Sequence, residues 1–275
     1  MTDRSELRTS QRTPYRVSAV LAFAAVITSS VSFFCWGVFH RDVPMIVGNM
    51  RGTALSMLAI AVPVLIVSMV MTARGSLRAR FVWLGSLAYI AYNAVLFCFM
   101  VHFNSFFLLF AALLGLSFWA LLTLLASFDL AAVQAAGSRV PVRAVVVYML
   151  VCLVVFGSVW LRDIVPATIH NTVPESFEGT GLTQNPIYVL DFAFTFPLLA
   201  ISAVWLWRRR AWGYLVAGMI VIMLTIETAS IAVDQTFGHI HDPSAPLGAV
   251  PLMLAFTGVG LMFRSEERRV GKECQ

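Results

Sequence analysis

Residues 106–127 read FFLLFAALLGLSFWALLTLLAS, a run of twenty-two positions without a charged side chain. A helix rises about 1.5 Å per residue, so about 20 apolar residues are needed to cross the ~30 Å hydrocarbon core of a bilayer. The run is long enough for that crossing. It therefore predicts a membrane-spanning helix.

Seven further apolar runs have a comparable length. They are, roughly, Val17–Phe39, Thr53–Met71, Phe81–Val101, Val142–Leu161, Ile187–Trp207, Trp212–Val233 and Leu247–Phe263. None shows the alternation over about ten residues that is typical of a membrane β-barrel. The sequence predicts an all-α, polytopic transmembrane helix bundle of about eight spans, with residues 1–263 as one transmembrane domain. Pro63 and Pro197 lie inside two of these runs, where a proline frees a backbone carbonyl and can kink a helix.

The composition of the whole chain supports the same class. Of its 275 residues, 59% are hydrophobic and 12% are charged. Soluble domains average about 45–50% apolar and about 25% charged residues. With half the usual charge, the chain could not cover a water-facing surface, which excludes a soluble enzyme, a disordered protein and a nucleic-acid binder. The lipid bilayer is its expected partner.

The arginines between the runs predict the orientation. Taking alternate gaps, beginning with the N-terminus, one side holds Arg4, Arg8, Arg12, Arg16, Arg74, Arg78, Arg80, Arg139, Arg143, Arg208, Arg209 and Arg210. The opposite side holds only Arg41, Arg51 and Arg162. Cytoplasmic loops carry the excess of basic residues. We therefore expect both termini in the cytoplasm and the chain in the inner, cytoplasmic membrane of a cell.

The C-terminal segment differs from the rest of the chain. Residues 264–274 read RSEERRVGKEC, which resembles an in-frame translation of a sequencing adapter, and Lys272 is the only lysine. Such segments are excluded from reasoning about a fold. Residues 264–275 are thus predicted to be a non-native tail. On this prediction the true C-terminus, beyond Phe263, is not given by the sequence. The alternative is a genuine charged cytoplasmic tail.

Ionisable residues inside apolar runs indicate a candidate binding site. Asp191 lies about one turn into the sixth run, and Glu227 and Asp234 are seven residues apart on nearly one face of the seventh. Acids inside a membrane are costly and by default suggest a function. If these stripes face each other, they line a polar pocket that opens to the outside. The expected pocket residues are Tyr89, Asn93, Tyr188, Asp191, Glu227 and Asp234.

Structural roles remain open for the same residues. Asp191 can cap the start of its helix. Glu227 can pair with Arg162 or with a tyrosine of the third run. Tyr89 and Asn93, four residues apart, can make hydrogen bonds between helices without lining a pocket.

All five histidines lie on the expected outer side, and three neighbouring residues there form a candidate metal site. In an extended segment His239 and His241 would point the same way, with the carboxylate of Asp242 beside them. Imidazole and carboxylate suit a divalent transition metal such as zinc, copper or iron. The spacing matches no zinc motif. The alternative is two solvated histidines, and no other cofactor is implied.

Several segments resemble a set of uncharacterised bacterial multi-pass membrane proteins. The segments that carry the resemblance are 89–93 (YIAYN), 102–104 (HFN), 115–117 (GLS) and 181–191 (GLTQNPIYVLD), followed by Pro197 and 205–210 (WLWRRR). The resemblance covers roughly the third to the seventh run and implies membership of that set without an activity. This chain has Tyr188 where the set often has histidine, which weakens a metal site at that position.

Three functions are compatible with these features. The first is binding or transport of a small solute, cation or proton through the outward-facing pocket, favoured by the acids and the two prolines. The second is a non-catalytic scaffold or sensor subunit. The third is a metal-dependent membrane-embedded hydrolase, with His239, His241 and Asp242 as ligands and Glu227 or Asp163 as general base. Substrate and oligomeric state are not readable from the sequence.

Overall fold

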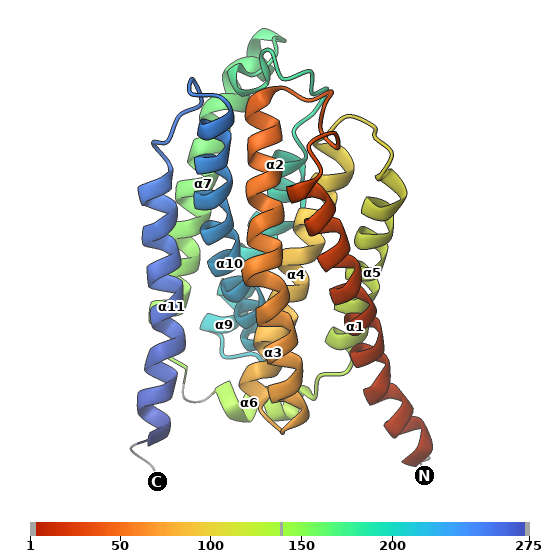
Figure 1. The fold of residues 1–275 in the computed structure, drawn as a ribbon. Helices are drawn as coiled ribbons and strands as arrows, with labels where there is room; N and C mark the ends of the chain where they lie inside the picture. Colours follow the sequence, from red (N-terminus) through yellow and green to blue (C-terminus); the bar gives the residue numbers. More distant parts are fainter. Residues whose placement is uncertain (1–3, 138–139, 273–275) are drawn as a thin grey trace. The chain divides into compact units, whose positions relative to one another are not determined.

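The computed structural model describes the backbone of residues 4–137 and 140–272, and the side chains of residues 12–137 and 140–263. Every regular element in this part of the chain is helical (Figure 1). The elements are α1 (Arg4–Phe34), α2 (Pro44–Ser56), η1 (Met57–Ala61), α3 (Val62–Ala73), α4 (Leu77–Phe99), α5 (Phe107–Ala126), α6 (Leu130–Gly137), α7 (Val142–His170), η2 (Glu175–Phe177), α8 (Pro186–Leu190), η3 (Asp191–Thr195), α9 (Phe196–Trp207), α10 (Ala211–His241) and α11 (Val250–Lys272). The predicted all-α class is confirmed. The tail at 264–275 lies outside the residues whose side chains are described.

Seven helical segments among the described residues are long and apolar enough to cross a membrane, so the chain is a multi-pass membrane protein. They are Arg12–Phe34, Pro44–Ala73, Leu77–Phe99, Phe107–Ala126, Val142–His170, Pro186–Trp207 and Ala211–His241. The eighth expected span, at Val250–Phe263, is apolar but shorter. Large apolar side chains such as Phe23, Leu108 and Val154 are exposed on these helices. Lipid covers such surfaces at no hydrophobic cost.

Several helices extend further than their apolar runs, and the difference is largest at three predicted ends, which are wrong. The second span begins at Pro44 instead of Thr53, the fifth ends at His170 instead of Leu161, and the seventh ends at His241 instead of Val233. The apolar run stops where a polar side chain begins, whereas the helix stops where its backbone hydrogen bonds stop. Arg51, expected in a loop, therefore lies inside α2, where it is buried.

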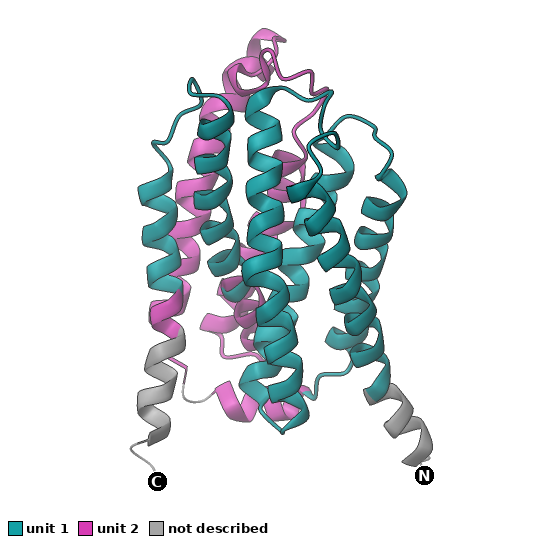
Figure 2. Cartoon of the chain, in the orientation of Figure 1, with its two compact units in different colours: residues 1–129, 222–260 teal, residues 130–221, 261–275 magenta. Residues whose placement is uncertain are grey.

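The helices group into two compact units by their contacts (Figure 2). Unit 1 comprises residues 1–129 and 222–260, and unit 2 comprises residues 130–221 and 261–275. Helix α10 passes from one unit into the other, because its first part belongs to unit 2 and its second part to unit 1. Each predicted site residue can therefore be assigned to one unit.

Helix α4 forms much of the interior of unit 1. It contacts α3 and α5, and it buries Trp83, Leu87, Tyr89 and Phe97 almost completely. The indole Nε1 of Trp83 donates to Ser18 Oγ of α1 over 3.0 Å. A buried indole N–H needs such an acceptor because leaving it unpaired costs free energy. The bond therefore satisfies a polar group and joins α1 to α4.

Two glycines allow α2 to approach α10 closely within unit 1. A Cβ atom at Gly48 would overlap the carbonyl oxygen of Phe237, and one at Gly52 would overlap the Cα atom of Asp234. The two glycines form a G-x-x-x-G pattern, which places both on one face of the helix. Small residues at this spacing let membrane helices come into backbone contact. The pattern brings α2 directly against the acidic face of α10.

Each mid-span proline follows a π-helical turn. Pro63 comes two residues after η1 ends, and Pro197 comes two residues after η3 ends. Proline lacks the amide hydrogen and collides with the carbonyl four residues earlier. The wider i→i+5 turn accommodates that collision, and such turns are frequent at functional sites. The sequence predicts a disruption at both prolines, and in the structure it is a π-helical turn. Asp191 lies at the start of the second of these turns.

We predict that Gly52→Ala destabilises unit 1 by about 1–3 kcal/mol, because its methyl group would force α2 away from Asp234. Unfolding of the purified protein by dodecyl sulfate in mixed micelles would measure the loss. The matched control is Gly115→Ala on α5, where a Cβ atom meets no heavy atom within 4 Å. That control should be neutral, or more stable by up to about 1 kcal/mol, since alanine is the better helix former. Equal losses in both variants would contradict the proposed close approach.

Candidate functional site

The polar face of α10 forms the centre of the site in unit 1. Glu227, Ser230 and Asp234 lie at positions i, i+3 and i+7, which places them along one face of the helix. Glu227 is only 7% exposed and Ser230 only 1%. Asp234 is half-buried, about two turns closer to the end of the helix at His241. An acid thus lies in the interior of a bundle that the sequence assigns to a membrane.

Helix α4 supplies the hydrogen-bond donors for the inner part of this face. The amide Nδ2 of Asn93 donates to Glu227 Oε2 over 2.7 Å and to the carbonyl oxygen of Tyr89 over 3.1 Å. The hydroxyl of Tyr89 donates to Ser230 Oγ over 2.9 Å. Tyr89 and Asn93 are both buried, so they face the interior as the sequence predicted. Both residues thus bind the polar face of α10 through uncharged donor groups.

Helix α2 supplies a third contact, which the sequence did not predict. The hydroxyl of Thr53 donates to Asp234 Oδ2 over 3.4 Å, and Thr53 is only 2% exposed. This contact depends on the preceding Gly52, whose missing side chain lets α2 lie against the backbone of Asp234. The sequence signal was the G-x-x-x-G pattern, but it does not tell which helix the glycines meet. Three helices of unit 1 therefore converge on the acids.

This arrangement can bind a positive ion. The carboxyl groups of Glu227 and Asp234 can each take up a proton or coordinate a hard cation through oxygen. The low dielectric around buried groups strengthens that electrostatic interaction. Since Glu227 and Asp234 are seven residues apart, they are about 10 Å apart along the helix axis. At this separation along the axis they would offer two successive positions to a cation rather than one shared site.

The other predicted pocket residues, Tyr188 and Asp191, lie in unit 2. The indole Nε1 of Trp160 on α7 donates to Asp191 Oδ2 over 2.8 Å, and Asp191 is 8% exposed. The hydroxyl of Tyr188 donates to Asp163 Oδ2 over 2.8 Å, and the same oxygen accepts from Ser176 over 2.6 Å. The six pocket residues thus fall into two sets, one in each unit.

Two alternatives from the sequence are now resolved by contacts. Asp191 does not cap its helix, because Asn185 is the N-cap and accepts from the backbone N–H of Ile187 over 3.0 Å. Glu227 bonds to the third span, where Asn93 is one of its donors.

A groove in unit 2 has no connection with these residues. It is lined by Val140, Pro141, Val142, Arg143, Ala144, Trp207 and Arg209. Trp207 ends α9, whereas Asp191 lies at the other end of the same span. None of the predicted pocket residues lines the groove.

The expected metal ligands are arranged differently from the prediction. His239 and His241 belong to the last turn of α10, so the extended segment that would align them is wrong. Residues two apart on a helix point about 200° apart. The Nδ1 atom of His239 bonds to the carbonyl oxygen of Ala245 over 2.8 Å, and that of His241 to the carbonyl oxygen of Phe237 over 2.9 Å. Among the described residues, no group of three or more His, Cys, Asp and Glu side chains could hold a metal ion.

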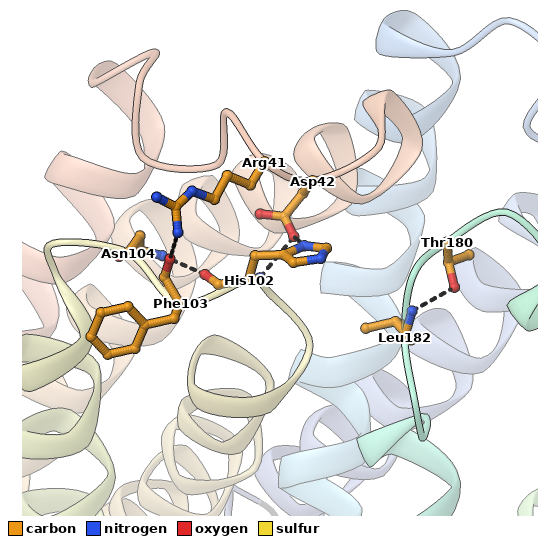
Figure 3. Close-up of polar contacts among 7 residues, drawn as sticks. All are labelled: Arg41, Asp42, His102, Phe103, Asn104, Thr180 and Leu182. Atoms are coloured by element: carbon orange, nitrogen blue, oxygen red, sulfur yellow. Dashed lines mark hydrogen bonds and ion pairs between the residues drawn. The ribbon is translucent and has the colours of Figure 1, made fainter.

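An ion pair that the sequence did not predict joins two loops of unit 1 (Figure 3). His102 Nδ1 and the His102 backbone N–H each lie 2.8 Å from Asp42 Oδ1. Arg41 Nη1 donates to the carbonyl oxygen of Phe103 over 3.3 Å. The loop between α1 and α2 is thereby tied to the loop between α4 and α5. Both residues were visible as polar groups at span ends, but only the fold shows that they meet.

We predict that Asn93 and Glu227 are energetically coupled. In a double-mutant cycle of Asn93→Ala and Glu227→Ala, the coupling free energy should be about 1–3 kcal/mol, because each single change leaves a buried polar partner unpaired. Unfolding by dodecyl sulfate would measure it. Asn93→Ala combined with Ser68→Ala on α3 is the control, since Ser68 bonds to the carbonyl oxygen of Leu65 and shares no partner with Asn93. A coupling near zero for the first pair would disprove the contact.

We predict a pH effect at Asp242, which lies just after α10. Hydrogen bonds from the Ser244 hydroxyl (2.6 Å) and backbone N–H (3.0 Å) to Oδ1 lower the pKa of the Asp242 carboxyl, with a smaller effect from His239. A lowered pKa stabilises the folded state above the ordinary range of the carboxyl, and that stabilisation is lost as the pH falls through the folded value. Ser244→Ala should raise the pKa, measured by carboxyl ¹³C chemical shifts of labelled aspartate. His239→Ala should raise it less, and the reverse order would contradict this assignment.

No family model, curated protein or solved structure matches the chain. What the chain itself shows is a multi-pass membrane protein with seven helical segments of spanning length among its described residues and a buried acidic face on α10.

Proposed function

We propose that this chain binds a proton or a small cation at Glu227 and Asp234 and carries it, alone or with a small solute, across the membrane. The observation that supports the proposal is the buried Glu227, whose Oε2 accepts from the neutral amide of Asn93 over 2.7 Å. Intramembrane acids mark ion paths and proton relays in membrane proteins. Asp234 on the same face of α10 provides a second position.

The surroundings of α10 support a polar path rather than a single buried acid. Hydroxyl groups of α1 and α2 are also buried in unit 1. They belong to Thr28, Ser29, Ser32, Thr53 and Ser56. Hydroxyl oxygens are suitable ligands for alkali and other hard cations, as they are for water. A transported cation would therefore meet oxygen ligands on more than one helix.

The span that contributes Thr53, Pro44–Ala73, contains an irregular helical turn. The π-helical η1 follows α2 directly, and Pro63 comes two residues after it ends. Interrupted helices near binding sites are typical of transporters, where they provide backbone carbonyls and places to bend. This feature favours transport over simple binding.

We further propose that both termini are cytoplasmic and that the acidic end of α10 faces outward, in the cytoplasmic membrane of a bacterium. The support is the distribution of arginine along the sequence. Twelve arginines lie on the proposed cytoplasmic side, against Arg41, Arg51 and Arg162 on the other.

A scaffold or sensor subunit is the second candidate. The contacts of Asn93 with Glu227 and of Tyr89 with Ser230 each join α4 to α10. Hydrogen bonds of this kind hold membrane helices together without any transport. A metal-dependent hydrolase is not proposed, because the Nδ1 atoms of His239 and His241 bond to backbone carbonyls and the two residues occupy different faces of a helical turn.

We predict that Glu227→Gln abolishes cation movement while preserving the fold, because glutamine keeps the hydrogen bond with Asn93 but carries no charge. The protein would be reconstituted in liposomes that contain a pH-sensitive dye, with an imposed potassium diffusion potential and, in a second series, a sodium gradient. Wild-type flux should exceed that of Glu227→Gln at least tenfold. The matched control is Glu178→Gln in an exposed loop of unit 2, which should retain wild-type flux. Equal flux in protein-free liposomes and with the wild type would reject transport and favour the scaffold.

A further inference from the structure

Arg51 on α2 is a buried cation whose hydrogen-bonding capacity is largely unused. It is only 8% exposed, and its Nη2 donates to the carbonyl oxygen of Phe33 over 2.7 Å. Its Nε and Nη1 atoms, which carry three of the five N–H groups, have no hydrogen-bond partner among the described residues. A buried charge normally finds a counter-ion because the loss of its hydration is costly.

Two aromatic rings lie against this guanidinium, whose Nε and Nη1 atoms are buried. The Cζ atom of Arg51 lies 3.9 Å from the ring centre of Trp36 and 5.7 Å from that of Phe33. A cation–π contact uses the face of the guanidinium plane, whereas its N–H groups point outward within that plane. The rings therefore orient the side chain without satisfying its donors.

Asp42 and Asp234 of unit 1 are not hydrogen-bonded counter-ions of Nε or Nη1 of Arg51. Asp42 Oδ1 accepts from His102, and Asp234 Oδ2 accepts from Thr53. Arg51 forms no hydrogen bond with either carboxylate through Nε or Nη1. Nε and Nη1 of Arg51 thus have no carboxylate partner among the described residues.

Other unpartnered polar groups surround the same end of α1. The hydroxyls of Thr28, Ser29 and Ser32 are fully buried and have no hydrogen-bond partner in the described part of the chain. Ser32 directly precedes Phe33, whose carbonyl binds Arg51. The imidazole of His241 lies 6.4 Å from the Trp36 ring, between centres, and its Nε2 is likewise buried and unpartnered.

We propose that Arg51 binds the carboxylate or phosphate group of a ligand that enters beside Trp36. Guanidinium donors are geometrically suited to planar or tetrahedral oxyanions, and a desolvated site strengthens that attraction. Trp36 is 76% exposed in the loop between α1 and α2, and the proposal places the entrance beside it. This anion site is separate from the acidic face of α10 and does not depend on the proposed cation transport. Two sources share the chemistry, a free small anion and the phosphate of a lipid headgroup.

The test measures binding of inorganic phosphate and of dihexanoyl phosphatidylglycerol to the full chain in a phosphate-free maltoside detergent by isothermal titration calorimetry. We expect wild-type protein to bind at least one of them, with the affinity reduced at least tenfold in Arg51→Gln. Binding of phosphate would identify a free anion, and binding of the lipid alone would identify a headgroup. The matched control is Arg41→Gln, which removes the same charge from an exposed neighbouring loop and should change the affinity less than twofold.

A second measurement keeps the proposal testable if Arg51→Gln does not fold. Ligand-induced changes in tryptophan fluorescence are compared between the wild type and Trp36→Phe, which keeps an aromatic ring at the exposed position. We expect a change in the wild type that disappears in Trp36→Phe. The proposal is overturned if neither anion binds, if Arg41→Gln weakens binding as much as Arg51→Gln, or if the fluorescence change persists without Trp36.

Discussion

Polar groups inside a bilayer must find partners within the protein, and the structure of this chain follows from that requirement. The backbone meets it by forming a helix in each spanning segment of the described residues, since a helix satisfies its own N–H and C=O groups. Polar side chains meet the same requirement by lying in the interior of a unit, where they bind to other helices. Asn93 with Glu227, Tyr89 with Ser230, and Trp160 with Asp191 are the clearest cases. The same inward placement creates a polar interior to which several helices contribute.

Close helix packing determines which polar groups meet. Gly48 and Gly52 bring α2 into contact with the backbone of α10, and this contact places Thr53 beside Asp234. It also carries Arg51, the neighbour of Gly52, toward the end of α1, where it binds the carbonyl oxygen of Phe33. One pair of small residues therefore supports two charged sites of opposite sign. The acidic face of α10 suits a cation, and the buried guanidinium suits an anion.

The prolines show how a local sequence feature becomes a structural one. Pro63 and Pro197 each follow a π-helical turn, because the helix widens where proline removes a hydrogen bond. In unit 2 the turn begins at Asp191, which receives the indole N–H of Trp160. In unit 1 the turn follows the helix that bears Arg51 and Thr53. Irregular backbone thus lies next to polar side chains in both units.

The sequence by itself determined the class of the protein and the residues that had to be buried. Apolar runs predicted membrane helices, and intramembrane Glu227, Asp191 and Asn93 were identified because their burial needs a partner. Hydropathy could not set the helix ends, since helices continue past the first charged residue, and it mistook the last turn of α10 for an extended segment. Only the tertiary structure decided the partners, because hydrogen bonds between helices depend on the register of segments more than a hundred residues apart. Arg51 shows this most clearly. Its position in the sequence suggested a loop charge, and the packing of α2 made it a buried one.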